Sequence, residues 1–299
     1  MSAFLLLLVC PFLGWVFGRY QWMPQGSHAA INAWLLRVAF PALVLAQVPE
    51  LIWDSALIFA IAGPWIVFAG AAILIPMIGR AAGWDRSSIG ALVLTCGLGN
   101  TAFVGLPMIG ALAGPQALGP ALIADQLGSF LALSTAGVVF ASIYAGDQID
   151  AREVTRRLLR FPPFLALVAA MLVRLLGGWP EEISTVLHRL GDTLTPLALF
   201  SIGLTFKFGA LRGRGGMVLA GLGWKLFLAP LAAFLVALVA GVGGTAMMAG
   251  VLQSAQGPMI TAGILAQEHR LNPDLVTLIV GTGVLMSFVT APLWFLFLR

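Results

Sequence analysis

Charged side chains are scarce in this 299-residue sequence. Only 9% of its residues are charged and 60% are hydrophobic, whereas about a quarter of the residues of a soluble globular domain are charged. The mean hydropathy is +0.99. This composition excludes an ordinary soluble domain and predicts a polytopic membrane protein. The net charge of +4 is spread over several short loops, so we expect no nucleic-acid partner.

The sequence also lacks the motifs of common enzyme classes. It contains no His-Glu-x-x-His, Cys-x-x-Cys or Gly-x-Ser-x-Gly pattern, and its three histidines are scattered. The glycine-rich stretch 209–216 lacks the Gly-Lys-Ser/Thr ending of a phosphate-binding loop. Cys10 and Cys96 fall in apolar segments and are expected to pack as small apolar residues. We therefore expect no enzyme, no metal site and no cofactor.

What the sequence does contain is a succession of long apolar segments. A helix that crosses a membrane needs about 20 predominantly apolar residues. The first segment lacks a basic region and a small-residue cleavage site before Arg19, so we count it as a span and not as a signal peptide. The expected fold class is an all-α polytopic membrane protein with ten transmembrane helices, at 2–18, 30–48, 55–79, 87–113, 117–145, 161–177, 183–208, 214–240, 243–267 and 273–298.

Two of these segments, the fourth and the ninth, are interrupted near their middle. Residues 99–107 read Gly-Asn-Thr-Ala-Phe-Val-Gly-Leu-Pro, and residues 253–258 read Gln-Ser-Ala-Gln-Gly-Pro. Lipid cannot satisfy the backbone groups that such breaks release, so a break at membrane depth persists only where protein or a water-filled cavity supplies partners. Each break is therefore a candidate binding site.

The two breaks are related by a repeat. Each is followed by Pro-Met-Ile, beginning at Pro107 and at Pro258, an offset of 151 residues or about half the chain. Pro11 and Pro162 keep the same offset. Chance alignment among the 17 prolines is the alternative. Paired interruptions in two halves are the best sequence indication of the substrate site of a transporter built from repeats.

The span count predicts how the repeat is arranged. Ten spans divide into two units of five, and consecutive units with an odd number of spans insert with opposite orientation, so the repeat is expected to be inverted, with broken, crossing helices 4 and 9. The predicted units are residues 1–145 and 161–299. Between them, residues 146–160 read as a cytoplasmic linker or as an amphipathic surface helix.

The basic residues set the expected orientation. Only Arg174 and Arg299 lie near the surface on the N-terminal side of the membrane. Because positively charged loops stay in the cytoplasm, we expect a protein of the cytoplasmic (inner) membrane with both termini outside. Eleven basic residues lie in the opposite loops, namely Arg19, Arg80, Arg86, Arg152, Arg156, Arg157, Arg160, Lys207, Arg212, Arg214 and Arg270.

Polar groups at the breaks define the expected substrate site. Asn100 follows about 13 residues of the fourth span, which is about 20 Å of helix and near the bilayer midplane. Gln256 reaches a similar depth. Unwound half-helix ends present free N–H groups that favour an anionic ligand group; the alternative is that Asn100 only satisfies freed backbone groups. The predicted substrate-binding residues are Asn100, Thr101, Gly105, Pro107, Gln253, Gln256, Gly257 and Pro258.

Four ionisable residues are expected at membrane depth, where a charge is costly and faces protein or water. Lys225 is a candidate for long-range attraction of an anion, with snorkelling towards the surface as the alternative. Asp125 is a candidate proton-carrying or support residue. Arg37 and Asp192 hold corresponding positions in the two halves and are candidates for a coupling pair, although Asp192 also lies four residues after His188, where pairing within one helix is easy.

Both breaks carry a family resemblance. The pattern Asn-Thr-x-x-Val-Gly-x-Pro at 100–107 resembles the crossover motif of auxin efflux carriers and their bacterial relatives. The segment 255–274 is similar to the ninth-span motif and following loop of the plant PIN carriers. The resemblance implies a fold like that of bile-acid symporters and sodium/proton antiporters, with a transport domain that moves like an elevator against a scaffold. It also implies small carboxylates as substrates, auxin-like or malonate-like.

The sequence departs from that family pattern in two places. It has no long cytoplasmic loop between its halves, and no acidic residue within the ninth span. The second departure argues against a sodium site of the bile-acid-symporter kind. With Asp125 and Asp192 as the acidic residues expected deep in the membrane, we expect transport that is coupled to protons or uncoupled.

The resulting hypothesis is a secondary transporter or facilitator for a small organic anion. The alternatives are a membrane sensor or receptor that binds a small carboxylate without transport, a sodium-coupled organic-anion symporter and, less favoured, a membrane enzyme. The expected partners are the organic anion and the lipid bilayer, with a homodimer as one option.

Overall fold

The computed structural model describes residues 2–51, 56–147, 151–205 and 214–299. About 85% of the chain is helical, and the described residues form no strand beyond a single bridge between Gly99 and Pro258. An all-α membrane protein is therefore confirmed. Of the sequence predictions, Lys207 and Arg212 lie outside the described residues, as do residue 55, part of the linker (148–150) and the end of the seventh predicted span (206–208).

Five helical segments are long and apolar enough to cross a membrane, by length and composition. Each coincides with a predicted span. Shorter apolar helices lie at Leu5–Arg19, Thr101–Ala113 and Pro162–Leu175. The long segments are Ser27–Glu50, Leu57–Ala81, Pro115–Ala145, Gly215–Val239 and Pro273–Leu298.

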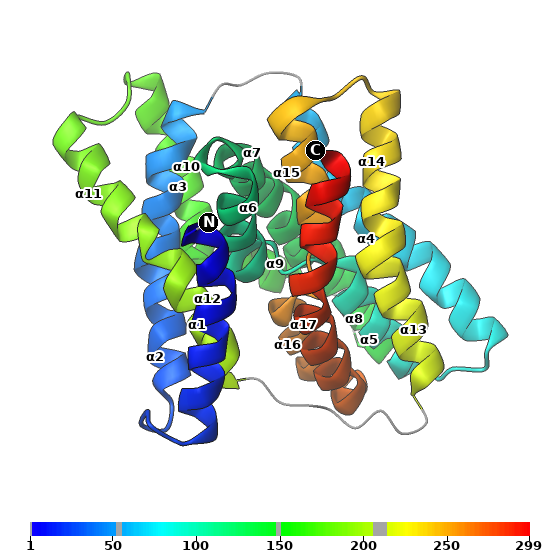
Figure 1. Ribbon diagram of the computed structural model, residues 1–299. Helices are drawn as coiled ribbons and strands as arrows, with labels where there is room; N and C mark the ends of the chain where they lie inside the picture. The colour runs from blue at the N-terminus through cyan, green and yellow to red at the C-terminus, as the bar shows by residue number, and fades with distance from the viewer. Residues whose placement is uncertain (1, 52–55, 148–150, 206–213) are drawn as a thin grey trace.

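One group of helices lies on the left of Figure 1. Helix α1 packs along α12, and α3 packs against α10 and α11. The first contact is close because it uses glycines: a Cβ atom at Gly14 would lie 2.1 Å from the carbonyl oxygen of Phe200. Small residues let membrane helices approach in this way. The group comprises α1 (Ser2–Arg19), α2 (Ser27–Trp34), the π-helical turn η1 (Leu35–Ala39), α3 (Phe40–Glu50), α10 (Pro162–Leu175), α11 (Glu181–Asp192) and α12 (Leu194–Thr205).

A second group fills the centre and right of Figure 1 and surrounds the largest apolar core. Helix α4 packs against α5, α15 and η4. Each group combines helices from both predicted halves of the chain. The second group comprises α4 (Ala56–Ala81), α5 (Arg86–Gly97), η2 (Thr101–Gly105), α6 (Leu106–Ala113), η3 (Pro115–Ala117), α7 (Leu118–Ile123), η4 (Ala124–Phe130), η5 (Leu133–Gly137), α8 (Val138–Ala145), α13 (Gly215–Gly223), η6 (Trp224–Leu228), α14 (Ala229–Val239), α15 (Gly244–Ser254), α16 (Ile260–Glu268) and α17 (Pro273–Leu298).

The described part of the linker is helical. Helix α9 (Ala151–Arg160) packs against η5 of the second group and α10 of the first. It ends where Phe161 begins an extended turn, and Pro162 starts the next helix, as expected for a residue without a backbone N–H at a helix start. The connection therefore brings its last residue, Arg160, to the boundary between the two helix groups.

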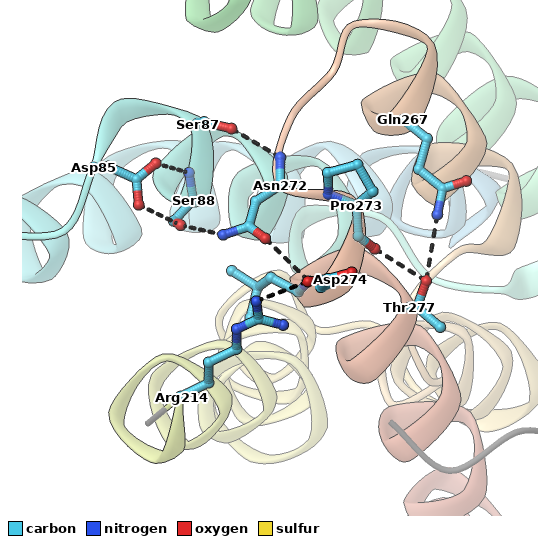
Figure 2. Close-up of polar contacts among 10 residues, drawn as sticks. Asp85, Ser87, Ser88, Arg214, Gln267, Asn272, Pro273, Asp274 and Thr277 are labelled. Carbon is cyan, nitrogen blue, oxygen red and sulfur yellow. Dashed lines mark hydrogen bonds and ion pairs between the residues drawn. The ribbon is translucent and has the colours of Figure 1, made fainter. Parts of the chain in front are cut away.

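A polar cluster ties the starts of α5 and α17 together (Figure 2). The Asn272 backbone N–H donates to Ser87 Oγ at 2.8 Å, and its side-chain amide donates to Ser88 Oγ at 2.7 Å. Asp85 caps α5 and accepts from the backbone N–H of Ser88 at 2.9 Å and from its hydroxyl at 2.6 Å. Partial burial raises the pKa of Asp85, but the hydrogen bonds from Ser88 outweigh this and hold the pKa below its usual range.

Candidate functional site

The two chain breaks meet and satisfy each other's backbone groups. The N–H of Asn100 donates to the carbonyl oxygen of Gly257 at 2.8 Å, and the N–H of Met259 donates to that of Leu98 at 2.9 Å. These two bonds flank the bridge between Gly99 and Pro258. An interruption inside lipid requires partners of this kind, so the fold stabilises the first break with the second.

Small residues and prolines make this crossing possible. A Cβ atom at Gly257 would lie 2.7 Å from the carbonyl oxygen of Gly283, and one at Gly105 would lie 2.1 Å from Gln253 Oε1. Pro107 lies within the helical run Thr101–Ala113, just after the π-helical turn η2, and has no backbone N–H to donate there. These predicted site residues therefore shape the crossing by their lack of bulk or of a donor.

A cavity of about 270 Å³ adjoins the first break. Its walls come from both helix groups, with Leu36 from the first and Asn100 from the second. Phe130 and Phe161 stack on its wall with ring centroids 4.0 Å apart. The polar side chains that line it are Asn100, Asp125, Ser134, Arg160 and Thr261, and the apolar ones are Leu36, Ala102, Phe103, Phe130, Leu133, Phe161 and Met259.

Asn100 has an unused donor at this cavity. The residue is 2% exposed, and its side-chain Nδ2 has no hydrogen-bond partner among the described residues. A buried amide donor without a partner is unfavourable by about 1–3 kcal/mol. A ligand oxygen in the cavity would supply that partner. In the alternative role, the Asn100 side chain would satisfy backbone groups freed by the break. Among the described residues, main-chain atoms make the bonds across the breaks.

Asp125 lines the same cavity and is held by neutral donors. Its Oδ1 accepts from the Thr101 hydroxyl, and its Oδ2 accepts from the Gln126 amide at 2.7 Å. The residue is 2% exposed, and no ion pair involving it is found in the described ranges. Thr101, a predicted substrate-binding residue, thus links the carboxylate to the first break.

Arg160 brings a positive charge to the cavity, and sequence reasoning assigned it only to a cytoplasmic loop. It is the last residue of α9 and its side chain is exposed. A guanidinium carries a fixed fork of donors that matches carboxylate geometry. The available signal was its position immediately before Phe-Pro-Pro, where the chain must turn into the next span.

The two predicted glutamines of the second half point elsewhere. The Gln253 amide donates to the carbonyl oxygen of Ala121 at 2.9 Å, and that of Gln256 donates to the carbonyl oxygen of Leu252 at 2.8 Å. Both side chains are buried, and neither is among the residues that line the cavity. The second half contributes Phe161, Met259 and Thr261 to the cavity instead.

Lys225 lies at the end of a half-helix. It is 1% exposed, and its Nζ donates to the carbonyl oxygen of Ser254, the last residue of α15, at 2.9 Å. A cation at a helix C-terminus stabilises the negative end of the helix dipole. Lys225 is not among the residues that line the cavity. Its amino group lies between the two breaks, because a Cβ atom at Gly99 would also lie 3.0 Å from Nζ.

The expected pairing of Arg37 and Asp192 is not found. Both side chains are exposed, and within the described ranges no ion pair joins either residue to the other or to His188. His188 instead approaches Glu50 on the neighbouring helix α3, with 3.5 Å between Nε2 and Oε1. Because α11 packs against α3, His188 has an acidic partner across the helix interface.

The chain has relatives among known proteins. A family model described as membrane transport protein matches residues 1–295. An uncharacterized transporter of Methanothermobacter thermautotrophicus is 25% identical over 290 residues, 96% of this chain and 95% of that protein. An uncharacterized transporter of Methanocaldococcus jannaschii is 22% identical over 308 residues, 98% of this chain and 97% of that protein.

Proposed function

The chain belongs to the membrane transport protein family, the auxin efflux carrier family, and from that premise we propose that it is a secondary transporter or facilitator for a small organic anion. The observation that carries the proposal is the cavity between the two helix groups. It combines a guanidinium, Arg160, with the unused amide donor of Asn100. Family membership also favours a transporter over an enzyme.

The two helix groups suggest how transport takes place. We propose ten spans in an inverted repeat, with the group that holds both breaks moving against the group of α1–α3 and α10–α12. The cavity takes walls from both groups, so their relative movement would open and close it, as alternating access requires. The proposed location is the cytoplasmic membrane, with both termini outside.

A binding screen followed by transport tests the function. Thermal unfolding of the purified protein is measured with malonate, benzoate and indole-3-acetate, because a ligand that binds only the folded state raises the unfolding temperature. The radiolabelled acid that binds is then offered to proteoliposomes. We expect saturable uptake. Binding without uptake would favour a sensor, and absence of both would contradict the proposal.

A matched pair of arginine variants tests the site. Arg160 and Arg156 both lie on α9 with exposed side chains, but only Arg160 lines the cavity. We expect Arg160→Gln to weaken binding of the selected acid about tenfold or more, as loss of a charged hydrogen bond worth about 1.5–3 kcal/mol implies. Arg156→Gln should bind normally. Equal effects would indicate general surface attraction.

A further inference from the structure

The cavity is lined by an acidic side chain, that of Asp125, which an anion transporter does not need in order to bind its substrate. Asp125 lines the cavity together with Asn100 and Arg160. An anion in a compact cavity of about 270 Å³ lies within the Debye length of about 10 Å from that carboxylate, so salt does not screen their repulsion. Binding of an anion and ionisation of Asp125 therefore oppose each other.

The neighbours of Asp125 offer it little fixed positive charge. Its segment, η4, packs against α4, α7, α10, α15, η2 and η5. Of these, α7, α15, η2 and η5 contain no ionisable side chain. On α4, Arg80 lies 16 residues beyond Pro64, about 24 Å along the helix, and Pro64 is the residue that approaches Gly128 of η4. On α10, Arg174 donates to carbonyl oxygens at the end of α3.

Among the described residues that line the cavity, Arg160 is the one basic side chain. In the empty cavity the donors from Thr101 and Gln126 favour the ionised carboxylate, and the guanidinium of Arg160 is not engaged by an anion. A bound organic anion engages the guanidinium as its own counter-ion and adds a negative charge. Both changes favour the neutral form of Asp125.

Resting on the proposed function, we propose that Asp125 takes up one proton from solvent when an organic anion binds in the cavity, so that anion and proton cross together. The proton adds to the Asp125 carboxylate and leaves it on the other side, when the anion departs. No other co-reactant is needed. Because binding and protonation are linked, the effect is reciprocal: lower pH tightens binding.

Calorimetry of the purified protein measures this linkage directly. The acid selected from malonate, benzoate and indole-3-acetate is titrated at several pH values, in sodium-free buffers of different ionisation enthalpy, which reports the protons taken up. For the wild type we expect uptake that approaches one proton per anion and an apparent Kd that rises by up to about tenfold per pH unit over the range where Asp125 is ionised in the free protein.

Three variants separate Asp125 from its surroundings. Asp125→Asn, a mimic of the neutral acid, should take up no proton and bind at every pH with the affinity that the wild type reaches at low pH. Thr101→Ala removes a donor that favours the carboxylate, so the fall in affinity should move to higher pH while the slope stays. Asp192→Asn, an exposed acid away from the cavity, should behave as the wild type.

The outcomes distinguish this proposal from the function on which it rests. The proposed role of Asp125 would be overturned if the wild type bound the anion without proton uptake, or if proton uptake persisted in Asp125→Asn. Neither result would contradict anion transport. If Asp125→Asn does not fold, an unmoved pH profile in Thr101→Ala overturns it. If none of the three acids binds, both the proposed anion transport and the proposed role of Asp125 are contradicted.

Discussion

The two chain breaks share a backbone arrangement but differ in what their side chains do. At the first break, the amide donor of Asn100 has no partner and its residue lines the cavity. At the second, the Gln256 amide nitrogen donates to the Leu252 carbonyl one turn earlier, while its Oε1 has no partner among the described residues, and Lys225 stabilises the end of α15. The first interruption therefore lines the proposed ligand cavity, whereas the side chains of the second are bonded within the crossing.

The largest expected effect follows from backbone packing at the second break. Gly257→Ala places a methyl group 2.7 Å from backbone atoms of Gly283 and Val284, which cannot move as a side chain does. We expect a loss of about 3 kcal/mol in stability, the upper part of the range for overpacking, measured by denaturant unfolding in detergent. Gly105→Ala meets the Gln253 side-chain amide instead and should lose less. Equal losses of stability in the two variants would contradict this difference between backbone and side-chain neighbours.

Removing the buried ammonium tests whether Lys225 supports the second break. Lys225→Met keeps the length of the side chain but leaves the Ser254 carbonyl oxygen without its donor. We expect a loss of about 2 kcal/mol, within the range for an unsatisfied buried acceptor, in the same unfolding assay. The folded variant should bind the selected acid with nearly the affinity of the wild type. A selective loss of affinity with unchanged stability would instead assign Lys225 to the anion.

The two amides should differ in stability as well. Gln256→Ala removes a hydrogen bond to Leu252 and should lower stability by about 1–2 kcal/mol. Asn100→Ala removes an amide donor without a partner and should leave the ligand-free protein at least as stable as the wild type, because a buried donor without a partner is itself unfavourable by about 1–3 kcal/mol. Thermal unfolding of both variants without ligand measures the difference. The reverse order would make Asn100 the structural residue.

The smallest effect concerns the cap that orients the first broken helix. Asp85→Asn keeps a capping oxygen but loses the charge that Ser88 stabilises. Since the folded-state pKa of Asp85 is lowered, its contribution is present above the unfolded pKa of about 3.9 and is lost as pH falls through the folded pKa. We expect the variant to be less stable at pH 7 and the difference to narrow below pH 4. A pH-independent difference would contradict this.

Much of the fold followed from the sequence because its signals are local. Apolar runs predicted the five long helices, and glycine and proline marked both breaks. The side-chain directions did not follow, because they depend on packing. Gln256 bonds within its own helix turn, His188 finds Glu50 on another helix, and Arg160 reaches the cavity only because α9 packs between η5 and α10.

One measurement tests most directly whether the ligand binds at the first break. Calorimetric titration of the acid selected in the screen is carried out on folded wild type, Asn100→Ala and Gln256→Ala at one pH. We predict that Asn100→Ala weakens binding about tenfold or more, because a hydrogen bond to a charged group is worth about 1.5–3 kcal/mol, while Gln256→Ala stays within about threefold. A loss in Gln256→Ala as large as or larger than that in Asn100→Ala would contradict the account.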